Sequence, residues 1–296
     1  MPIDAKTIQI FLPDGEPRGI RIAEITTRIV QAVQVPRARL DRIMKRDELD
    51  HIGMYFLFGE SEEQAKPVAY IGQSEDLRGR LKQHHSAKDF WTTAVLLVSK
   101  TDSFTLAHIR YLEWHSINEA TQAGRYTLDN GNVPSKPFIT EPMEADVLDA
   151  FETGSNLLST LGFPLFDPVG GKKVADAEET TFYCSGPDAK ASGRLVEDGF
   201  VVLKGATARS ESVPSAHKYM VTRRQAMITS GVLIADGSSL RFTEDYLFES
   251  PSGAAMLVLG RTANGWKEWK SADGRTLDKV ERDGDSAEIS QTNENH

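Results

Sequence analysis

The chain has 296 residues, a formal net charge of −9 at pH 7 and a hydrophobic content of 40%. This length allows at least one full hydrophobic core and favours two domains, and the negative net charge argues against a protein that coats nucleic acid over its whole surface. No run of about 18 apolar residues is present, so no transmembrane helix is expected. The only cysteine, Cys184, excludes an intrachain disulfide and a cysteine zinc site. The first residues lack the basic-then-apolar order of a secretory signal, and we therefore expect a cytoplasmic protein with no membrane partner.

The first 50 residues predict an extension made of two strands and one helix. The strands are expected over residues 7–12 and 20–25, and Pro36 can open the helix. Residues 37–46 then hold five basic side chains and one aspartate. We expect residues 1–50 to pack beside the following segment and to extend a basic surface there.

Two strands that each carry a tyrosine are predicted next. Residues 54–58 and 68–71 are rich in aromatic and β-branched side chains, and the polar link between them has the composition of a hairpin loop. The strands contain Gly53-Met54-Tyr55 and Tyr70-Ile71-Gly72. Gly72 ends the second strand pattern.

A helix is predicted after these strands, with Ser74 as its cap and an end near His85. Leu77 and Leu81 share one face of this helix at i,i+4 spacing, and Arg80 and His84 share the neighbouring face.

The same helix is basic, because residues 78–88 hold four basic side chains, two histidines and no acid. A phosphate backbone could meet this patch despite the negative net charge. The candidates for contact with nucleic acid are Arg78, Lys82, His85 and Lys88. The alternative is that these side chains form a solvated helix face.

A third strand is expected over residues 90–98, and a long helix over residues 105–123, capped by Asp102 or Ser103. Glu113 falls on the apolar stripe of that helix. A buried carboxylate without a partner is unfavourable by several kcal/mol, so this position calls for a partner, and a cation is one. The alternatives are a salt bridge to a core arginine or a helix edge where the acid reaches water.

The ordered set Tyr55, Tyr70, Arg80, His84 and Glu113 resembles the GIY-YIG nuclease family. Arg80 follows Gly72 by eight residues, which is the family spacing. Two departures are visible: Met54 stands where isoleucine is usual, and the two tyrosines lie fifteen positions apart, a few more than is typical. The polar loop between the strands can absorb the added residues.

The resemblance implies a small sheet that carries both tyrosines, and one Mg²⁺ or Mn²⁺ ion held by Glu113. It also implies a catalytic asparagine after the glutamate helix. Asn130 is the chosen candidate, with Asn118 and Asn132 as rivals. A plain Asn-Gly turn would explain Asn130 without any function.

The remaining residues predict a helix over 141–161 that ends at Gly162, a linker over 164–179, a second domain over 180–282 and an acidic disordered tail over 283–296. In the second domain, strands are expected over 182–184, 193–195 and 200–203. A helix is expected over 223–230, another is opened by Ser250 and Pro251, and Asn264-Gly265 predicts a tight turn.

The second domain resembles a domain of unknown function often attached to GIY-YIG nucleases. Its end also resembles the restriction-enzyme-adenine-methylase-associated module, on the following residues: Ser250-Pro251-Ser252, Ala254-Ala255, Gly260, Asn264-Gly265-Trp266 and Trp269. Trp266 and Trp269 could stack on a base. The alternative is that both tryptophans belong to the core of a small domain.

The expected fold class is therefore α+β. Residues 51–140 form a small, mainly antiparallel GIY-YIG sheet flanked by helices, residues 141–179 a helix and linker, and residues 180–282 a smaller α+β domain that is a possible nucleic-acid reader. The expected function is metal-dependent endonuclease activity, with DNA favoured over RNA as the partner, in phage defence, restriction or repair. The alternative is a catalytically inactive nucleic-acid-binding or adaptor protein.

Overall fold

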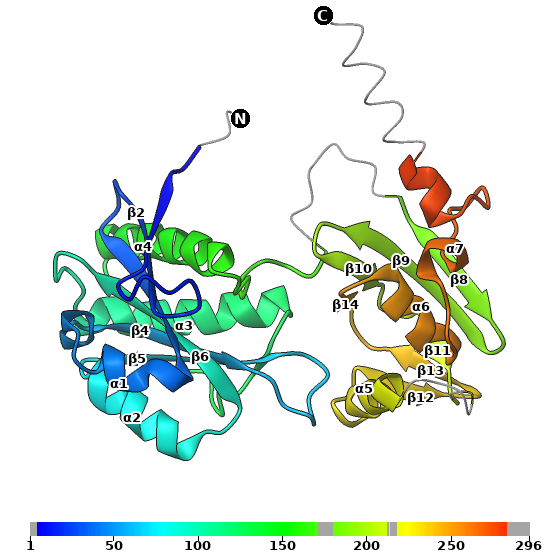
Figure 1. Cartoon of the computed structure of the whole chain (residues 1–296), viewed down its shortest axis with the longest axis horizontal. Helices are drawn as coiled ribbons and strands as arrows, with labels where there is room; N and C mark the ends of the chain where they lie inside the picture. Colours follow the sequence, from blue (N-terminus) through cyan, green and yellow to red (C-terminus); the bar gives the residue numbers. More distant parts are fainter. Residues whose placement is uncertain (1–4, 171–179, 212, 214–217, 283–296) are drawn as a thin grey trace, which may run out of the picture. The chain divides into compact units, whose positions relative to one another are not determined.

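The computed structural model describes residues 5–170, 180–211, 213 and 218–282. Two compact units are distinguished, unit 1 with Met1–Ser61 and Lys66–Pro168, and unit 2 with Glu62–Ala65 and Val169–His296. Each unit contains a sheet and helices (Figure 1), which confirms the predicted α+β class. Within the described residues, no helix has the length and apolar character needed to cross a membrane.

Unit 1 is built on a seven-stranded sheet with the order β1-β2-β3-β6-β4-β5-β7. All neighbouring strands are antiparallel except β5 and β7, which are parallel. The strands are β1 (Ile8–Phe11), β2 (Arg21–Ile25), β3 (Val30–Pro36), β4 (Gly53–Gly59), β5 (Val68–Ser74), β6 (Trp91–Ser99) and β7 (Thr127–Leu128).

Helices cover both faces of this sheet, with α1 and α2 on one side and α3 and α4 on the other (Figure 1). Their bounds, with those of two 3-10 turns, are η1 (Arg37–Arg39), α1 (Leu40–Ile43), η2 (Asp47–Asp50), α2 (Leu77–Ala87), α3 (Leu106–Ala123) and α4 (Glu141–Thr160). Strand β4 therefore has apolar side chains on both faces. Tyr55 and Leu57 belong to the core on the α2 side, whereas Phe56 and Phe58 belong to the core on the side of α3 and α4.

The first 50 residues contribute three strands to the same sheet. The strand β3 was not predicted, although its side chains alternate between buried and half-buried positions along most of its length. Pro36 ends β3, and a single 3-10 turn precedes the short α1. Pro36 thus stands directly before a helical segment, as predicted, but this segment starts as a 3-10 turn. Strand β3 was missed because Val30–Pro36 pairs along its whole length with β6, a partner more than 50 positions away in the sequence.

The predicted helix caps were close to the observed ones but wrong in identity. In α2 the cap is Asp76, whose side chain accepts a hydrogen bond from Gly79 N, while Ser74 Oγ accepts one from Asp76 N. In α3 the cap is Thr105, which forms a capping box with the side chain of His108. A carboxylate or hydroxyl at several adjacent positions can accept the same end N–H groups, so composition alone does not select the residue.

Unit 2 has a four-stranded and a three-stranded sheet with three helices. The four-stranded sheet has the order β14-β10-β9-β8 and the other the order β11-β13-β12. The strands are β8 (Phe182–Gly186), β9 (Ala189–Val196), β10 (Gly199–Val202), β11 (Thr207–Arg209), β12 (Leu233–Asp236), β13 (Ser239–Phe242) and β14 (Tyr246–Phe248). The helices are α5 (Lys218–Thr229), α6 (Pro251–Leu259) and α7 (Gly265–Glu268). The strands β11 to β14 were not predicted.

The start of α6 confirms one prediction and the start of α7 corrects another. Ser250 caps α6 and accepts a hydrogen bond from Gly253 N, as expected. Asn264-Gly265 is not a hairpin turn, because Asn264 caps the short helix α7 by accepting from Trp266 N. Residues 171–179 of the predicted linker and the predicted acidic tail, 283–296, lie outside the described residues.

Candidate active site

Tyr55 and Tyr70 lie on the paired strands β4 and β5, as predicted. Their rings are stacked, with centroids 6.0 Å apart and planes at 24°. Tyr55 is directly opposite Gly72 in the antiparallel register. A Cβ atom added at Gly72 would lie 2.3 Å from the Tyr55 hydroxyl oxygen, so the phenol occupies the space that any other residue would fill. Position 72 must therefore be glycine as long as the Tyr55 side chain occupies this space.

This contact gives a stability prediction. We expect Gly72→Ala to lower the free energy of unfolding by about 1–3 kcal/mol, because the added methyl group must displace the buried Tyr55 ring. Gly131→Ala is the matched control, since its Cβ would meet no atom within 4 Å. Denaturant unfolding of both variants checks this. Equal stabilities for the two would show that the ring moves away without loss.

Helix α2 brings Arg80 and His84 to the hydroxyl of Tyr55. Leu77 and Leu81 are fully buried against the sheet, which confirms the predicted apolar face and fixes the rotation of the helix. Arg80 Nε then donates a hydrogen bond of 3.2 Å to Tyr55 Oη, and Tyr55 Oη lies 2.9 Å from His84 Nε2.

The protonation of this cluster follows from its burial. Burial raises the pKa of Tyr55 well above its usual value, and the charge of Tyr70 adds to this rise. The hydrogen bond from Arg80 acts in the opposite direction. Burial, helped by the charges of Arg80 and Lys88, lowers the pKa of His84 to about 4. Near neutral pH, Tyr55 is therefore a protonated phenol that accepts from Arg80 and donates to Nε2 of a neutral His84.

The lowered pKa of His84 predicts a pH-dependent stability. The unfolded chain takes up a proton on His84 near the ordinary histidine pKa of 6.5, and the folded chain only near a pKa of about 4. The contribution of neutral His84 is thus present above the unfolded pKa and is lost as the pH falls towards the folded pKa. We expect the melting temperature of the wild type to fall more over this interval than that of His84→Gln, whose neutral amide does not titrate. Parallel curves for the two proteins would contradict the assignment.

Glu113 lies at the edge of the apolar stripe of α3. Ile109 and Ile117 are buried, whereas Glu113 is half-buried. Burial raises the pKa of its carboxyl group, while the charge of Arg80 and a hydrogen bond from the backbone of Gln73 act in the opposite direction. No basic side chain of the described residues forms an ion pair with Glu113. The alternative of a salt bridge to a core arginine is therefore not observed, and Glu113 is a half-buried carboxylate within range of the charge of Arg80.

The donors present fit one hard divalent cation. The described part of the chain contains no group of three or more His, Cys, Asp or Glu residues able to hold a metal ion. Mg²⁺ commonly keeps several waters and binds through one or two carboxylates together with a substrate phosphate. Glu113 alone matches that requirement, and it is the residue that would hold the ion.

Asn130 lies beside the site, but its side chain is occupied. Its Oδ1 accepts from Ile71 N at 3.0 Å, and its Nδ2 donates to Ile71 O at 2.7 Å. The amide therefore continues the pairing of β7 with β5, next to Gly72. These bonds give Asn130 a positioning role for the strand that carries Tyr70, and its catalytic role stays a prediction. The rival Asn118 donates to Trp114 O within α3, and Asn132 is exposed.

The predicted nucleic-acid contacts of α2 divide into two groups. Arg78 is a structural residue, because its guanidinium donates to Met44 O, Arg46 O and Asp50. Its side chain is 34% exposed, so these hydrogen bonds give it a structural role and leave its contact with nucleic acid a prediction.

Lys82 and His85 are exposed, and His85 Nδ1 accepts from Arg37. Lys88 forms an ion pair with Asp129 and lies over the Tyr70 ring, 4.5 Å from its centroid. It therefore helps to hold Tyr70.

Sequence reasoning missed one residue of the cluster. Gln83 Oε1 accepts a 2.7 Å hydrogen bond from Arg80 Nη1. The signal was available, since residues three apart on a helix are neighbours. With Nε directed at Tyr55 and Nη1 at Gln83, Nη2 of Arg80 has no hydrogen-bond partner among the described residues.

The two predicted tryptophans of unit 2 have different environments. Trp269 is fully buried, donates from its indole nitrogen to Pro251 O at 3.0 Å and packs against Phe200. The prediction that it stacks on a base was wrong, because no face of the ring is accessible. Trp266 is 39% exposed.

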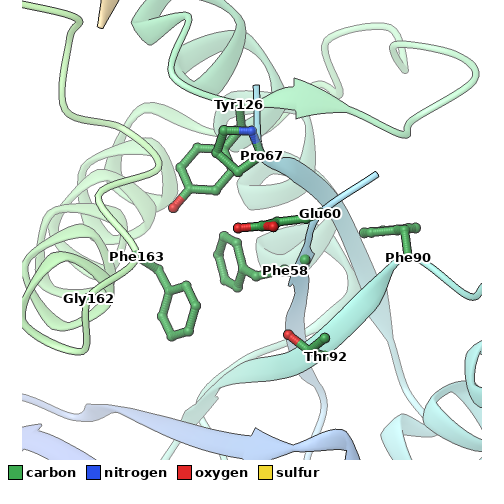
Figure 2. Close-up of a pocket in the computed structure, with 9 residues that line it drawn as sticks. Phe58, Glu60, Pro67, Phe90, Thr92, Tyr126, Gly162 and Phe163 are labelled. Atoms are coloured by element: carbon green, nitrogen blue, oxygen red, sulfur yellow. The ribbon is translucent and has the colours of Figure 1, made fainter. Parts of the chain in front are cut away.

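A cavity of about 330 Å³ lies at the other end of β4 from Tyr55. Figure 2 shows Phe58, Tyr126 and Phe163 around it, and Glu60 is its one charged lining residue. None of the predicted site residues lines this cavity, so its size alone does not make it the active site.

Comparisons with known proteins bear on unit 2. Residues 182–281 match a family model described as a domain of unknown function (DUF4357), which confirms the resemblance predicted for this region at that level. No GIY-YIG family match is found. Neither the curated proteins nor the solved structures contain a match to this chain.

Proposed function

We propose that the protein is a cytoplasmic, metal-dependent endonuclease of the GIY-YIG type that hydrolyses phosphodiester bonds in DNA. The observation that carries this proposal is the cluster in which Tyr55 is hydrogen-bonded to both Arg80 and His84, close to a half-buried Glu113 without an ionic partner. The order and spacing of these residues resemble that family.

The proposed chemistry assigns one task to each side chain. Tyr55 is fully buried in the free protein, so this role requires that substrate binding uncover its hydroxyl group. The Tyr55 oxygen then accepts a proton from the attacking water while its own proton passes to His84 Nε2 along the 2.9 Å hydrogen bond. The resulting hydroxide forms the new bond to phosphorus, and the bond to the leaving oxygen breaks. The leaving oxygen takes up a proton from solvent water, and His84 releases its proton to solvent. Nη2 of Arg80 stabilises the negative charge that develops on the phosphate oxygens. Glu113 would hold a divalent cation, which would supply Lewis-acid stabilisation of the same charge.

Tyr70 and its neighbours support this arrangement. The Tyr70 ring is held between the stacked Tyr55 ring and the Lys88 ammonium group. We infer that its hydroxyl orients the water or the phosphate. We relate residues 182–281 to the restriction-enzyme-adenine-methylase-associated module. We propose that this domain selects the substrate.

A panel of nucleic acids tests this function. Supercoiled plasmid, linear duplex, single-stranded DNA, modified DNA and RNA are incubated with the protein, with Mg²⁺ or with excess chelator. We expect cleavage of at least one DNA that requires the metal. Binding of a nucleic acid without any cleavage would instead support the inactive binding protein, and an absence of both would support the adaptor.

A further inference from the structure

A second cavity, of about 180 Å³, lies in unit 2 between α5 and the start of α6. Its lining includes Tyr219, Met220, Arg223, Phe248, Ser250 and Gly253. This cavity shares no residue with the proposed active site. Its polar lining groups come from α5, with Tyr219 and Arg223, and from the segment between β14 and α6, with Glu249 and Ser250.

Arg223 is the charged centre of this cavity and is held by aromatic side chains. Its Nη1 donates to Tyr219 Oη at 2.5 Å, and its Nη2 lies 3.4 Å from Tyr246 Oη. The guanidinium carbon is 5.9 Å from the ring centroids of both tyrosines and 5.8 Å from that of Phe248. Weak cation–π contacts of this kind fix the orientation of a guanidinium group without neutralising its charge.

Arg223 has no carboxylate partner within salt-bridge distance in the described part of the chain. The neighbouring Arg224 shows the contrast. Arg224 is buried, and its guanidinium donates to the carbonyl oxygens of Arg209 and Leu257, which is a structural use of the side chain. Arg223 instead presents a positioned positive charge, without a direct ion pair, to a cavity that Glu249 also lines.

We propose that this cavity binds a backbone phosphate of single-stranded nucleic acid through Arg223, with the neighbouring base stacked on Tyr219. This inference rests on the proposed function, because it takes nucleic acid as the partner. A planar guanidinium group suits the geometry of a phosphate. Tyr219 is 68% exposed, an unusual position for a large aromatic ring unless the ring has a partner to cover it. Ser250 also lines the cavity, and its hydroxyl, whose oxygen accepts from Gly253 N, still has a hydrogen to donate.

Glu249 also lines the cavity, and its substitution tests whether the bound group is negatively or positively charged. A carboxylate at the edge of an anion site repels the ligand, so Glu249→Gln is expected to strengthen phosphate binding. If the cavity took a cation instead, the same substitution would weaken binding.

The experiment measures binding of fluorescently labelled single-stranded DNA by the full chain, using anisotropy at several salt concentrations in excess chelator. We expect Arg223→Gln to weaken binding by about tenfold and to reduce the salt dependence by about one phosphate contact. Tyr219→Ala is expected to weaken it too, and Glu249→Gln to strengthen it. Arg241→Gln is the matched control, because Arg241 is an exposed arginine of unit 2 already paired with Asp236. Thermal unfolding shows whether each variant is folded.

Equal losses of affinity in the Arg223 and Arg241 variants would overturn the proposal. It would also be overturned if Glu249→Gln did not bind more tightly than the wild type and the wild type did not bind more tightly than Arg223→Gln. Displacement of the strand by micromolar inorganic phosphate would also overturn it, in favour of a site for free phosphate.

The outcome is separable from that of the proposed function. If Arg223 makes no contribution while Mg²⁺-dependent cleavage persists, the cavity proposal fails and the active site stands. If binding depends on Arg223 but no substrate is cleaved, the nuclease proposal fails and the cavity stands.

Discussion

Glu113→Gln is expected to abolish metal-dependent cleavage while the protein remains folded. Glutamine keeps the shape of the side chain but removes the charge that would hold the cation. The Lewis-acid contribution of a catalytic metal is several kcal/mol, which corresponds to a loss of about a thousandfold or more in rate. The measurement is the cleavage rate of the best DNA substrate under saturating Mg²⁺.

The stability of Glu113→Gln should change in the opposite direction from its activity. The raised pKa means that ionisation of Glu113 destabilises the folded state as the pH rises above the pKa of the unfolded chain. Glutamine removes this ionisation, so the melting temperature at neutral pH should be unchanged or higher. Glu119→Gln, the same chemical change on the same helix, is the control and should keep full activity. Normal cleavage by Glu113→Gln would rule out the metal role.

Arg80→Ala is expected to have the second large effect on the cleavage rate. Loss of the group that stabilises charge on the phosphate should raise the barrier by about 2–4 kcal/mol, comparable to the loss of an oxyanion donor. It also removes the N–H donor to Tyr55, so the phenol loses the contact that favours its ionised form. Single-turnover rates measure this effect separately from substrate binding.

Arg80→Lys distinguishes geometry from charge. One ammonium group cannot hold Tyr55 Oη, Gln83 Oε1 and a phosphate oxygen together, so we expect lysine to restore little of the rate. Lys82→Ala removes the same charge from an exposed position of the same helix and should alter mainly the affinity for the substrate. Near-normal rates with lysine would show that Arg80 contributes only long-range charge.

The sequence predicted the elements around Tyr55 well because local patterns specify them. The aromatic and β-branched segments formed β4 and β5, and the i,i+4 pairs on α2 placed Leu77 and Leu81 inward. Arg80 and His84 then followed geometrically from the helix repeat. Only the structure shows that both side chains converge on the Tyr55 hydroxyl.

Other positions depended on partners that are distant in the sequence. Arg78 and Lys82 are equivalent in a helical pattern, yet only Arg78 meets the carbonyl groups of the segment around α1. Asn130 was predicted from a resemblance, and its two hydrogen bonds to Ile71 depend on the pairing of β7 with β5. Such contacts carry no local signal, because any exposed polar side chain satisfies the same pattern.

Packing decided the role of the second-unit tryptophans. Trp266 and Trp269 lie three residues apart on one short segment, and composition favours neither a core nor a binding role for one over the other. The observed α7 turns Trp269 into the core, where its indole nitrogen finds Pro251 O. The Arg223 cavity was not predicted, because it requires α5 and α6 to lie side by side.

The cleavage rates of four proteins on one DNA substrate test the central claim most directly: the wild type, Glu113→Gln, Arg80→Ala and the double variant. If Glu113 and Arg80 act on the same phosphate as one active site, the double variant should be no slower than the slower single variant, because effects within one catalytic unit are not additive. The account predicts this result together with complete dependence of the wild type on Mg²⁺. Equal rates for all four proteins would contradict it.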